Sequence, residues 1–164
     1  MRPLGETKVT KKPLWNSFDM SKATKRINAA YIDGRAQSPR YIQQQLLRLH
    51  DTLVENAKHV RDAIRSDSHH TASEVEVEYY LALQSVKDQY LQLNVERIIE
   101  DEYHLANLID SPSRMIAAGV VYISPADHTR LYSIVAPVAA AIAAGNCVVL
   151  EVSKVQVTGS IHRD

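Results

Sequence analysis

The sequence of 164 residues is poor in cysteine and has no excess of either charge. Its single cysteine, Cys147, excludes an internal disulfide and fits a reducing compartment. The 19 basic and 19 acidic residues cancel, so charge gives no argument for binding to nucleic acid or to an anionic membrane. No apolar run reaches the roughly 18 residues that span a bilayer. We therefore expect a soluble, cytoplasmic protein without nucleic-acid or membrane partners.

The composition is that of a globular protein. An apolar fraction of 45% and a charged fraction of 23% are ordinary for a domain that buries a core. Residues 1–37 mix proline, glycine and basic residues, and we expect an irregular N-terminal arm there. The rest of the chain divides into a helical layer over residues 38–110 and an α/β unit over residues 111–164.

Two long amphipathic helices are predicted in the helical layer. Ser38-Pro39 is a helix start, with serine at the N-cap and proline at the first helical position. Apolar residues then recur every three or four positions to Ile64, which predicts one continuous helix of about seven turns. The same spacing predicts a second helix from residue 74 to about residue 102. Such helices pack antiparallel and leave apolar surface for another element.

The turn between these helices carries adjacent histidines, His69 and His70. Adjacent side chains point in different directions, and no cysteine or carboxylate is placed to complete a tetrahedral site. We expect a solvated turn and no metal site.

A strand, a helix and a second strand follow. Residues 115–124 are nearly continuous apolar residues rich in valine and isoleucine, which predicts a strand covered on both faces. Residues 129–144 predict a crossover helix that ends at Gly145-Asn146, and Cys147–Leu150 predicts the next buried strand. This order predicts parallel strands with a right-handed crossover. The predicted fold class is therefore α/β, a long amphipathic helix pair followed by a β-α-β unit.

Two motifs in this unit resemble a known family. Gly119-Val-Val-Tyr-Ile-Ser-Pro125 and Ala144-Gly-Asn-Cys-Val-Val-Leu150, followed by Ser153, are similar to the first cofactor-binding unit of aldehyde dehydrogenases. The helix from Ser38 resembles the amino-terminal helix of that family. The resemblance covers most of this chain but only the leading part of a typical family member. It implies a Rossmann-like sheet with the dinucleotide at the carboxyl ends of the strands.

The resemblance also implies functional positions, and this sequence departs from the family at two of them. The family places a tryptophan–asparagine pair after the first loop's proline, and the asparagine amide stabilises an oxyanion. Here Asp127 and His128 follow instead, and a carboxylate would repel that oxyanion. Glu151 replaces a lysine that binds the adenine ribose, although glutamate can accept hydrogen bonds from ribose hydroxyls. The cofactor-binding positions implied are Ile123, Ser124, Pro125, Glu151 and Ser153.

The redox chemistry of the family needs groups that are missing from this sequence. The cysteine nucleophile and the glutamate general base of the family lie downstream of the part that matches. Cys147 lies in a predicted apolar strand, where burial keeps a thiol protonated and inert. We expect no NAD(P)-dependent aldehyde oxidation by this chain alone, and no cofactor unless the altered site still binds NAD(P).

Three functional interpretations stay open. The first is a truncated aldehyde dehydrogenase-like protein that acts as a non-redox or interaction module, forming a homo-oligomer or binding a partner subunit through an exposed helix and sheet edge. The second is a repurposed non-redox enzyme of the isomerase or cyclase type, in which Asp127 and His128 act on a small apolar substrate by acid–base catalysis. The third is an N-terminal piece of an aldehyde dehydrogenase. Residues 155–164 are expected to begin a helix that stops short.

Overall fold

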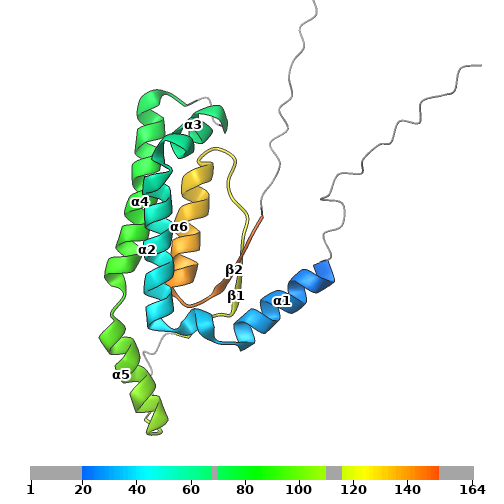
Figure 1. The fold of residues 1–164 in the computed structure, drawn as a ribbon, viewed down its shortest axis with the longest axis vertical. Helices are drawn as coiled ribbons and strands as arrows, with labels where there is room; N and C mark the ends of the chain where they lie inside the picture. The colour runs from blue at the N-terminus through cyan, green and yellow to red at the C-terminus, as the bar shows by residue number, and fades with distance from the viewer. Residues whose placement is uncertain (1–19, 68–69, 110–115, 152–164) are drawn as a thin grey trace, which may run out of the picture.

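The computed structural model describes residues 20–67, 70–109 and 116–151 (Figure 1). The predicted arm before residue 20, the predicted final helix and Ser153 lie outside these ranges. None of the described helices is long and apolar enough to cross a bilayer. The elements are, in chain order, α1 (Met20–Ile32), the short 3-10 helix η1 (Arg35–Gln37), α2 (Pro39–Glu55), α3 (Ala57–Asp67), α4 (Ala72–Gln92), α5 (Val95–Ala106), β1 (Val120–Ile123), α6 (Arg130–Ala143) and β2 (Cys147–Leu150).

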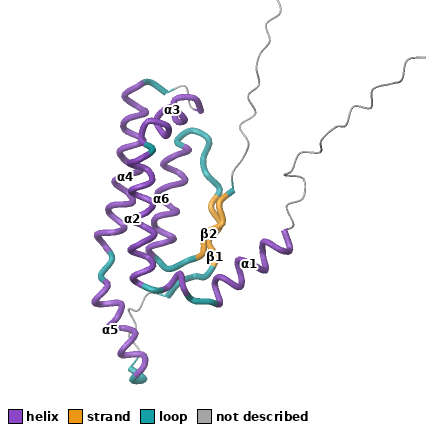
Figure 2. Tube along the Cα trace, in the orientation of Figure 1, coloured by secondary structure: helices purple, strands orange, loops and turns teal. Residues whose placement is uncertain are grey.

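The fold is mostly helical, with one small parallel sheet (Figure 2). β1 and β2 pair in parallel, with Val120 opposite Cys147 and Ile123 opposite Leu150. α6 connects the two strands, as the sequence predicts, and Thr129 occupies its N-cap position. The α/β class is therefore confirmed. The assignment of this unit to a Rossmann-like sheet stays a prediction.

The first predicted long helix is in fact two helices. Ser38 takes the N-cap position of α2 and Pro39 begins the helix, although the Ser38 side chain makes no capping hydrogen bond. α2 ends before Asn56, whose side-chain amide donates to the Thr52 carbonyl at 2.8 Å. An asparagine that bonds the backbone locally competes with the next helical turn. The prediction of one continuous helix was therefore wrong at Asn56, where α3 takes over.

The second predicted long helix is also interrupted. α4 begins with a capping box in which Thr71 Oγ1 accepts from the Glu74 N–H and Glu74 Oε2 accepts from the Thr71 N–H. It ends at Gln92, and α5 begins after Asn94, whose side chain accepts from the Arg97 N–H at 2.9 Å. This second N-cap restarts the helix, so a single helix over residues 74–102 was also wrong.

The prediction of an irregular arm over residues 1–37 was wrong for residues 20–32, which form the helix α1. α1 contacts both strands. Gly119, just before β1, has a φ of +110°, and a side chain there would meet the ring of Tyr31 from α1 at 3.3 Å. Glycine at this position therefore lets α1 approach the start of the sheet.

One hydrophobic core joins the helices to the α/β unit. α2 and α4 pack against each other and run antiparallel, and α6 lies between this pair and the sheet (Figure 1). α6 is rich in alanine, so its backbone comes close to both neighbours. The main buried cluster draws on α2, α4 and α6, and consists of Ile42, Leu46, Leu53, Ala82, Val86, Val135 and Ala139.

The sheet is covered less completely than the sequence predicts. Ile123 is 6% exposed, but Val120 and Tyr122 are 41% and 62% exposed. Successive side chains of a strand point to opposite faces, so β1 buries one face and leaves the other open. All residues of β2 are half-buried. The prediction of a strand covered on both faces was therefore wrong for β1.

Candidate functional site

Three polar side chains meet at the carboxyl ends of the two strands. Glu151 follows β2, and its Oε2 accepts hydrogen bonds from Tyr122 Oη and Ser124 Oγ, each at 2.7 Å. Tyr122 lies in β1 and Ser124 directly follows it. The Glu151 N–H donates to the Ile123 carbonyl at 2.9 Å, which continues the ladder between the strands. The parallel register thus brings residues 27 and 29 positions apart into one cluster.

The hydrogen bonds in this cluster stabilise a negative charge. The donors Tyr122 and Ser124 lower the pKa of Glu151, with the bond from Tyr122 the larger cause. The same bond, to an acceptor that is an anion, raises the pKa of Tyr122 above its ordinary value. Glu151 is therefore a carboxylate at neutral pH and Tyr122 a neutral donor. Oε1 of Glu151 takes part in neither bond and is the oxygen to which a ligand hydroxyl could donate.

Four of the five predicted cofactor-binding residues lie in the described ranges, and their surroundings differ. Ser124 and Glu151 meet in the cluster, Ile123 is buried in the core, and Pro125 is half-buried in the loop after β1. A cofactor role for any of them stays a prediction. Tyr122 was missed, although its position two residues before Ser124 places both side chains on the same face of the strand.

The predicted acid–base pair lies on the surface. The side chain of Asp127 is 96% exposed, and its Oδ1 accepts from an Arg130 Nη at 3.2 Å. Arg130 also approaches Asp67 at 3.7 Å, so it is shared between two carboxylates. His128 is exposed beside them. The catalytic role of Asp127 and His128 stays a prediction, and the geometry gives Asp127 a partner at the start of α6.

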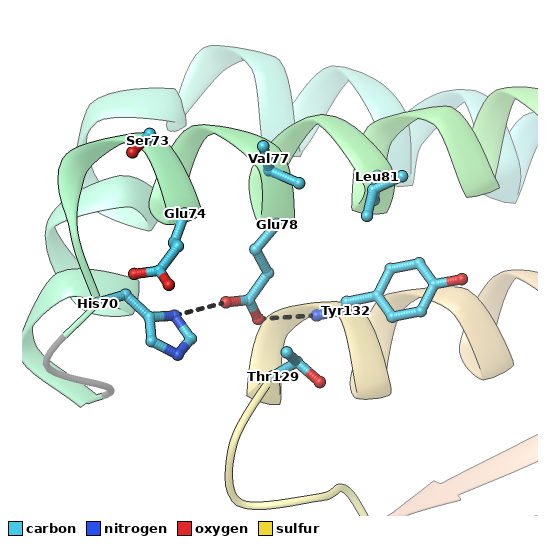
Figure 3. Close-up of a pocket in the computed structure, with 8 residues that line it drawn as sticks. All are labelled: His70, Ser73, Glu74, Val77, Glu78, Leu81, Thr129 and Tyr132. Atoms are coloured by element: carbon cyan, nitrogen blue, oxygen red, sulfur yellow. Dashed lines mark hydrogen bonds and ion pairs between the residues drawn. The ribbon is translucent and has the colours of Figure 1, made fainter.

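A pocket lies between α4 and the start of α6 (Figure 3). Its volume is about 390 Å³, and it is open to the surface. Apolar side chains from α4 and the ring of Tyr132 from α6 form its walls. The residues that line it are His70, Ser73, Glu74, Val77, Glu78, Leu81, Thr129 and Tyr132.

Glu78 is the buried charge beside this pocket. It is 5% exposed, and its Oε1 accepts from the backbone N–H of Tyr132 at 3.3 Å. The Thr129 side chain makes no capping bond, so Glu78 of α4 supplies the acceptor for the N-terminus of α6. Its Oε2 lies 3.7 Å from His70 Nδ1, beyond hydrogen-bond distance, and both atoms are buried without a hydrogen-bond partner (Figure 3).

This role of Glu78 was not predicted from the sequence. The signal was present, because Glu78 lies three residues after Val75 and four before Ala82, both in the buried stripe of α4. A carboxylate in an apolar stripe needs a polar partner. Its actual partner is 54 residues away in the sequence, where no local pattern indicates it.

Metal binding and thiol chemistry have little support among the described residues. No group of three or more histidine, cysteine, aspartate or glutamate side chains in the described ranges could hold a metal ion. Cys147 is half-buried at the first position of β2, opposite Val120 of β1. Its thiol is part of the sheet rather than of the loops at the carboxyl ends of the strands.

Comparison with curated proteins finds relatives of one kind. Over 134 residues, or 79% of this chain, the sequence is 31% identical to aldehyde dehydrogenase family 3 member B1 of Mus musculus. The chain is aldehyde dehydrogenase-like. Over the same length it is 32% identical to member B1 of Rattus norvegicus and 28% identical to member B3 of Mus musculus. The resemblance predicted from the two motifs is confirmed.

This aldehyde dehydrogenase-like chain spans 28% of the length of each of these relatives. No protein-family model matches it. No solved structure matches it at a significant level. The similarity therefore establishes the relationship and leaves the activity of this chain to be argued from its own residues.

Glu78 gives a first prediction, on stability. Glu78→Ala removes the acceptor of the Tyr132 N–H in a buried place, and we expect it to lower the free energy of unfolding by about 1–3 kcal/mol. Glu78→Gln keeps a carbonyl acceptor and should cost less. Urea denaturation followed by circular dichroism measures both. Equal losses for the two variants would contradict the capping role.

The cluster at the sheet gives a second prediction, on ionisation. Tyr122→Phe removes the stronger donor to Glu151, so the pKa of Glu151 should rise toward its ordinary value of about 4.3. Because the folded-state pKa is lowered, Glu151 stabilises the fold above its unfolded pKa, and this contribution is lost as pH falls through the folded pKa. The substitution should reduce it.

Carboxyl-carbon NMR titration of Glu151 checks this shift. Tyr80→Phe is the matched control, because Tyr80 is 62% exposed on α4, far from Glu151 in the sequence. A pKa for Glu151 that is the same in Tyr122→Phe as in the unsubstituted chain would refute the assignment.

Proposed function

We propose that this chain is a non-redox interaction module built on an aldehyde dehydrogenase-like scaffold. The observation that carries the proposal is the open sheet. Within the described residues, β1 pairs only with β2, and β1 exposes Val120 and Tyr122 on its open face. Parallel sheets are normally covered on both faces. The edge of β1 away from β2 has no strand partner among these residues, and such an edge is a template for a further strand from a partner.

The altered site supports the non-redox part of the proposal. The anionic Glu151 replaces the family's lysine, and Tyr122 and Ser124 fix its charge at the carboxyl ends of the strands. None of these three side chains is a cation that could neutralise the phosphates of a dinucleotide. Asp127 likewise puts a carboxylate where a neutral amide donor is implied. Cys147, the single thiol in the sequence, belongs to β2.

The partner in this proposal is a polypeptide, either another subunit or a second copy. Strand addition draws its affinity from main-chain hydrogen bonds and its specificity from alternate side chains. On β1 those alternate side chains are Val120 and Tyr122, which are apolar and aromatic. A partner strand added at that edge would place its own apolar side chains beside them on the same face.

Site-specific photo-crosslinking tests the proposal. A photoreactive residue at Val120 should give a discrete crosslinked species in cells that make the chain, whereas the same residue at Tyr80 of α4 should not. The partner identified by mass spectrometry should bind the purified chain and lose at least about tenfold in affinity with Tyr122→Asp. Equal crosslinking at both positions would overturn the interaction proposal. NAD(P)H formation from aldehydes by the purified chain would overturn its non-redox part.

A second candidate is acid–base chemistry of the isomerase or cyclase type. The observation that favours it is the approach of His70 Nδ1 to 3.7 Å from Oε2 of the buried Glu78, which places a histidine and a carboxyl group next to the apolar walls of the pocket. The apolar walls support this location for a small apolar substrate, whereas the predicted Asp127 and His128 are exposed.

Deuterium exchange from solvent into a panel of small apolar ketones, read by mass spectrometry, tests this candidate. His70→Gln should abolish catalysed exchange, since glutamine cannot take up the proton. His128→Gln, the matched control, should leave it unchanged. Absence of catalysed exchange across the panel, or exchange that survives in His70→Gln, would remove the candidate.

A further inference from the structure

A second surface of the helical layer carries an apolar groove, away from the sheet. The groove lies between α2 and α4 and has a volume of about 400 Å³. Leu47 and Leu91 on its walls are 44% and 67% exposed. His50 and Lys87 are its basic lining groups, Tyr90 adds a phenol, and no carboxylate lines it. Asp51 Oδ1 lies 3.5 Å from His50 Nδ1, so Lys87 is the lining cation on which the argument depends. The groove therefore suits an apolar element that brings negative charge.

α5 is an element of that kind. Its sequence, VERIIEDEYHLA, contains four carboxylates and one arginine, and none of its residues is buried. Ile99, Tyr103 and Ala106 follow each other at steps of four and three, so they form one stripe on the helix. Ile99 and Tyr103 on this stripe are 55% and 69% exposed. Helices of this kind bind in apolar grooves through such a stripe.

One carboxylate lies within the apolar stripe of α5. Glu102 is three residues after Ile99 and four before Ala106, so it shares their face. A carboxylate that enters an apolar contact without a partner loses its hydration. Lys87 lies among the apolar side chains of the groove and offers the matching charge. The pair would fix the register of the helix in the groove.

α5 contacts α2 but does not line the groove of its own chain, whose lining residues lie on α2 and α4. Leu93 and Asn94 separate it from α4, and it extends past the end of the α2 and α4 pair (Figure 1). Its 12 residues rise about 18 Å, enough to lie along several turns of another helix pair. The groove and the apolar stripe of α5 are thus both exposed in one molecule.

We propose that α5 of one copy binds in the groove between α2 and α4 of a second copy, with Glu102 paired to Lys87 of that copy. The contact is reciprocal, so two identical helix-in-groove contacts form around one two-fold axis and close the assembly as a dimer. The zero net charge of the sequence gives no long-range repulsion between copies. The contact is independent of the sheet edge and goes beyond the function proposed above.

Charge reversal in the full chain tests this dimer. The unsubstituted chain should show a monomer–dimer equilibrium in analytical ultracentrifugation between micromolar and near-millimolar concentration. Lys87→Glu and Glu102→Lys should each raise the dimer Kd by at least about tenfold, because each puts two like charges in contact. The double variant, which restores opposite charges, should recover the Kd to within about threefold.

Matched controls keep this test specific. Glu100→Lys makes the same charge change two positions before Glu102, where the side chain points away from that of Glu102. Lys58→Glu makes the reverse change on α3, where the side chain is exposed. Both should leave the Kd unchanged. Circular dichroism and urea denaturation should show all variants folded.

Three other outcomes of these measurements would overturn the proposed dimer. A chain that stays monomeric at every concentration has no such dimer. A dimer whose Kd is unchanged by both charge reversals uses another surface. If Val120→Lys then abolishes that dimer, the surface is the sheet edge, and the proposed function still stands. A monomer in which the two reversals compensate in unfolding free energy would mean that α5 folds back onto its own groove.

Discussion

The close packing of α6 between the helix pair and the sheet supports every site described above. Val135 and Ala139 enter the main core with residues of α2 and α4, and the small alanine side chains let the backbones approach. Glu78 then holds the N-terminus of α6 from α4. This bond positions the pocket beside it. Because α6 also links β1 to β2, its position sets the register that brings Tyr122 and Glu151 together.

The fold could be predicted where the signals are local and agree. The end of α6 at Gly145 and the bounds of β2 follow from contiguous motifs, and both are confirmed. The helix interruptions at Asn56 and Asn94 were missed because apolar spacing continues across them, while a single asparagine side chain decides the backbone. α1 was missed because its residues give little apolar contrast and its packing partner, the sheet, lies about 90 positions later.

The candidate site was predictable to the extent that strand register determines it. Ser124 and Glu151 end neighbouring strands and do meet. The place of Asp127 after a strand predicts a site residue, but Arg130, which begins the next helix, forms an ion pair with it at the surface. The contact of Glu78 with α6 depends on tertiary packing alone. The local sequence pattern therefore predicts which residues follow neighbouring strands and lie close together. It does not predict which charged side chain caps the end of a helix that is distant in the sequence.

The turn at Gly145 limits which sequences can share this arrangement. Its φ is +72°, and a Cβ atom would lie 3.3 Å from the Cα of Gln37. A side chain there would meet both backbone strain and a neighbouring main chain that cannot rotate away. A substitution at position 145 is thus strained, while exposed neighbours such as Ala144 can vary. Among diverging copies of this gene, glycine should therefore be retained at position 145 more often than alanine at position 144.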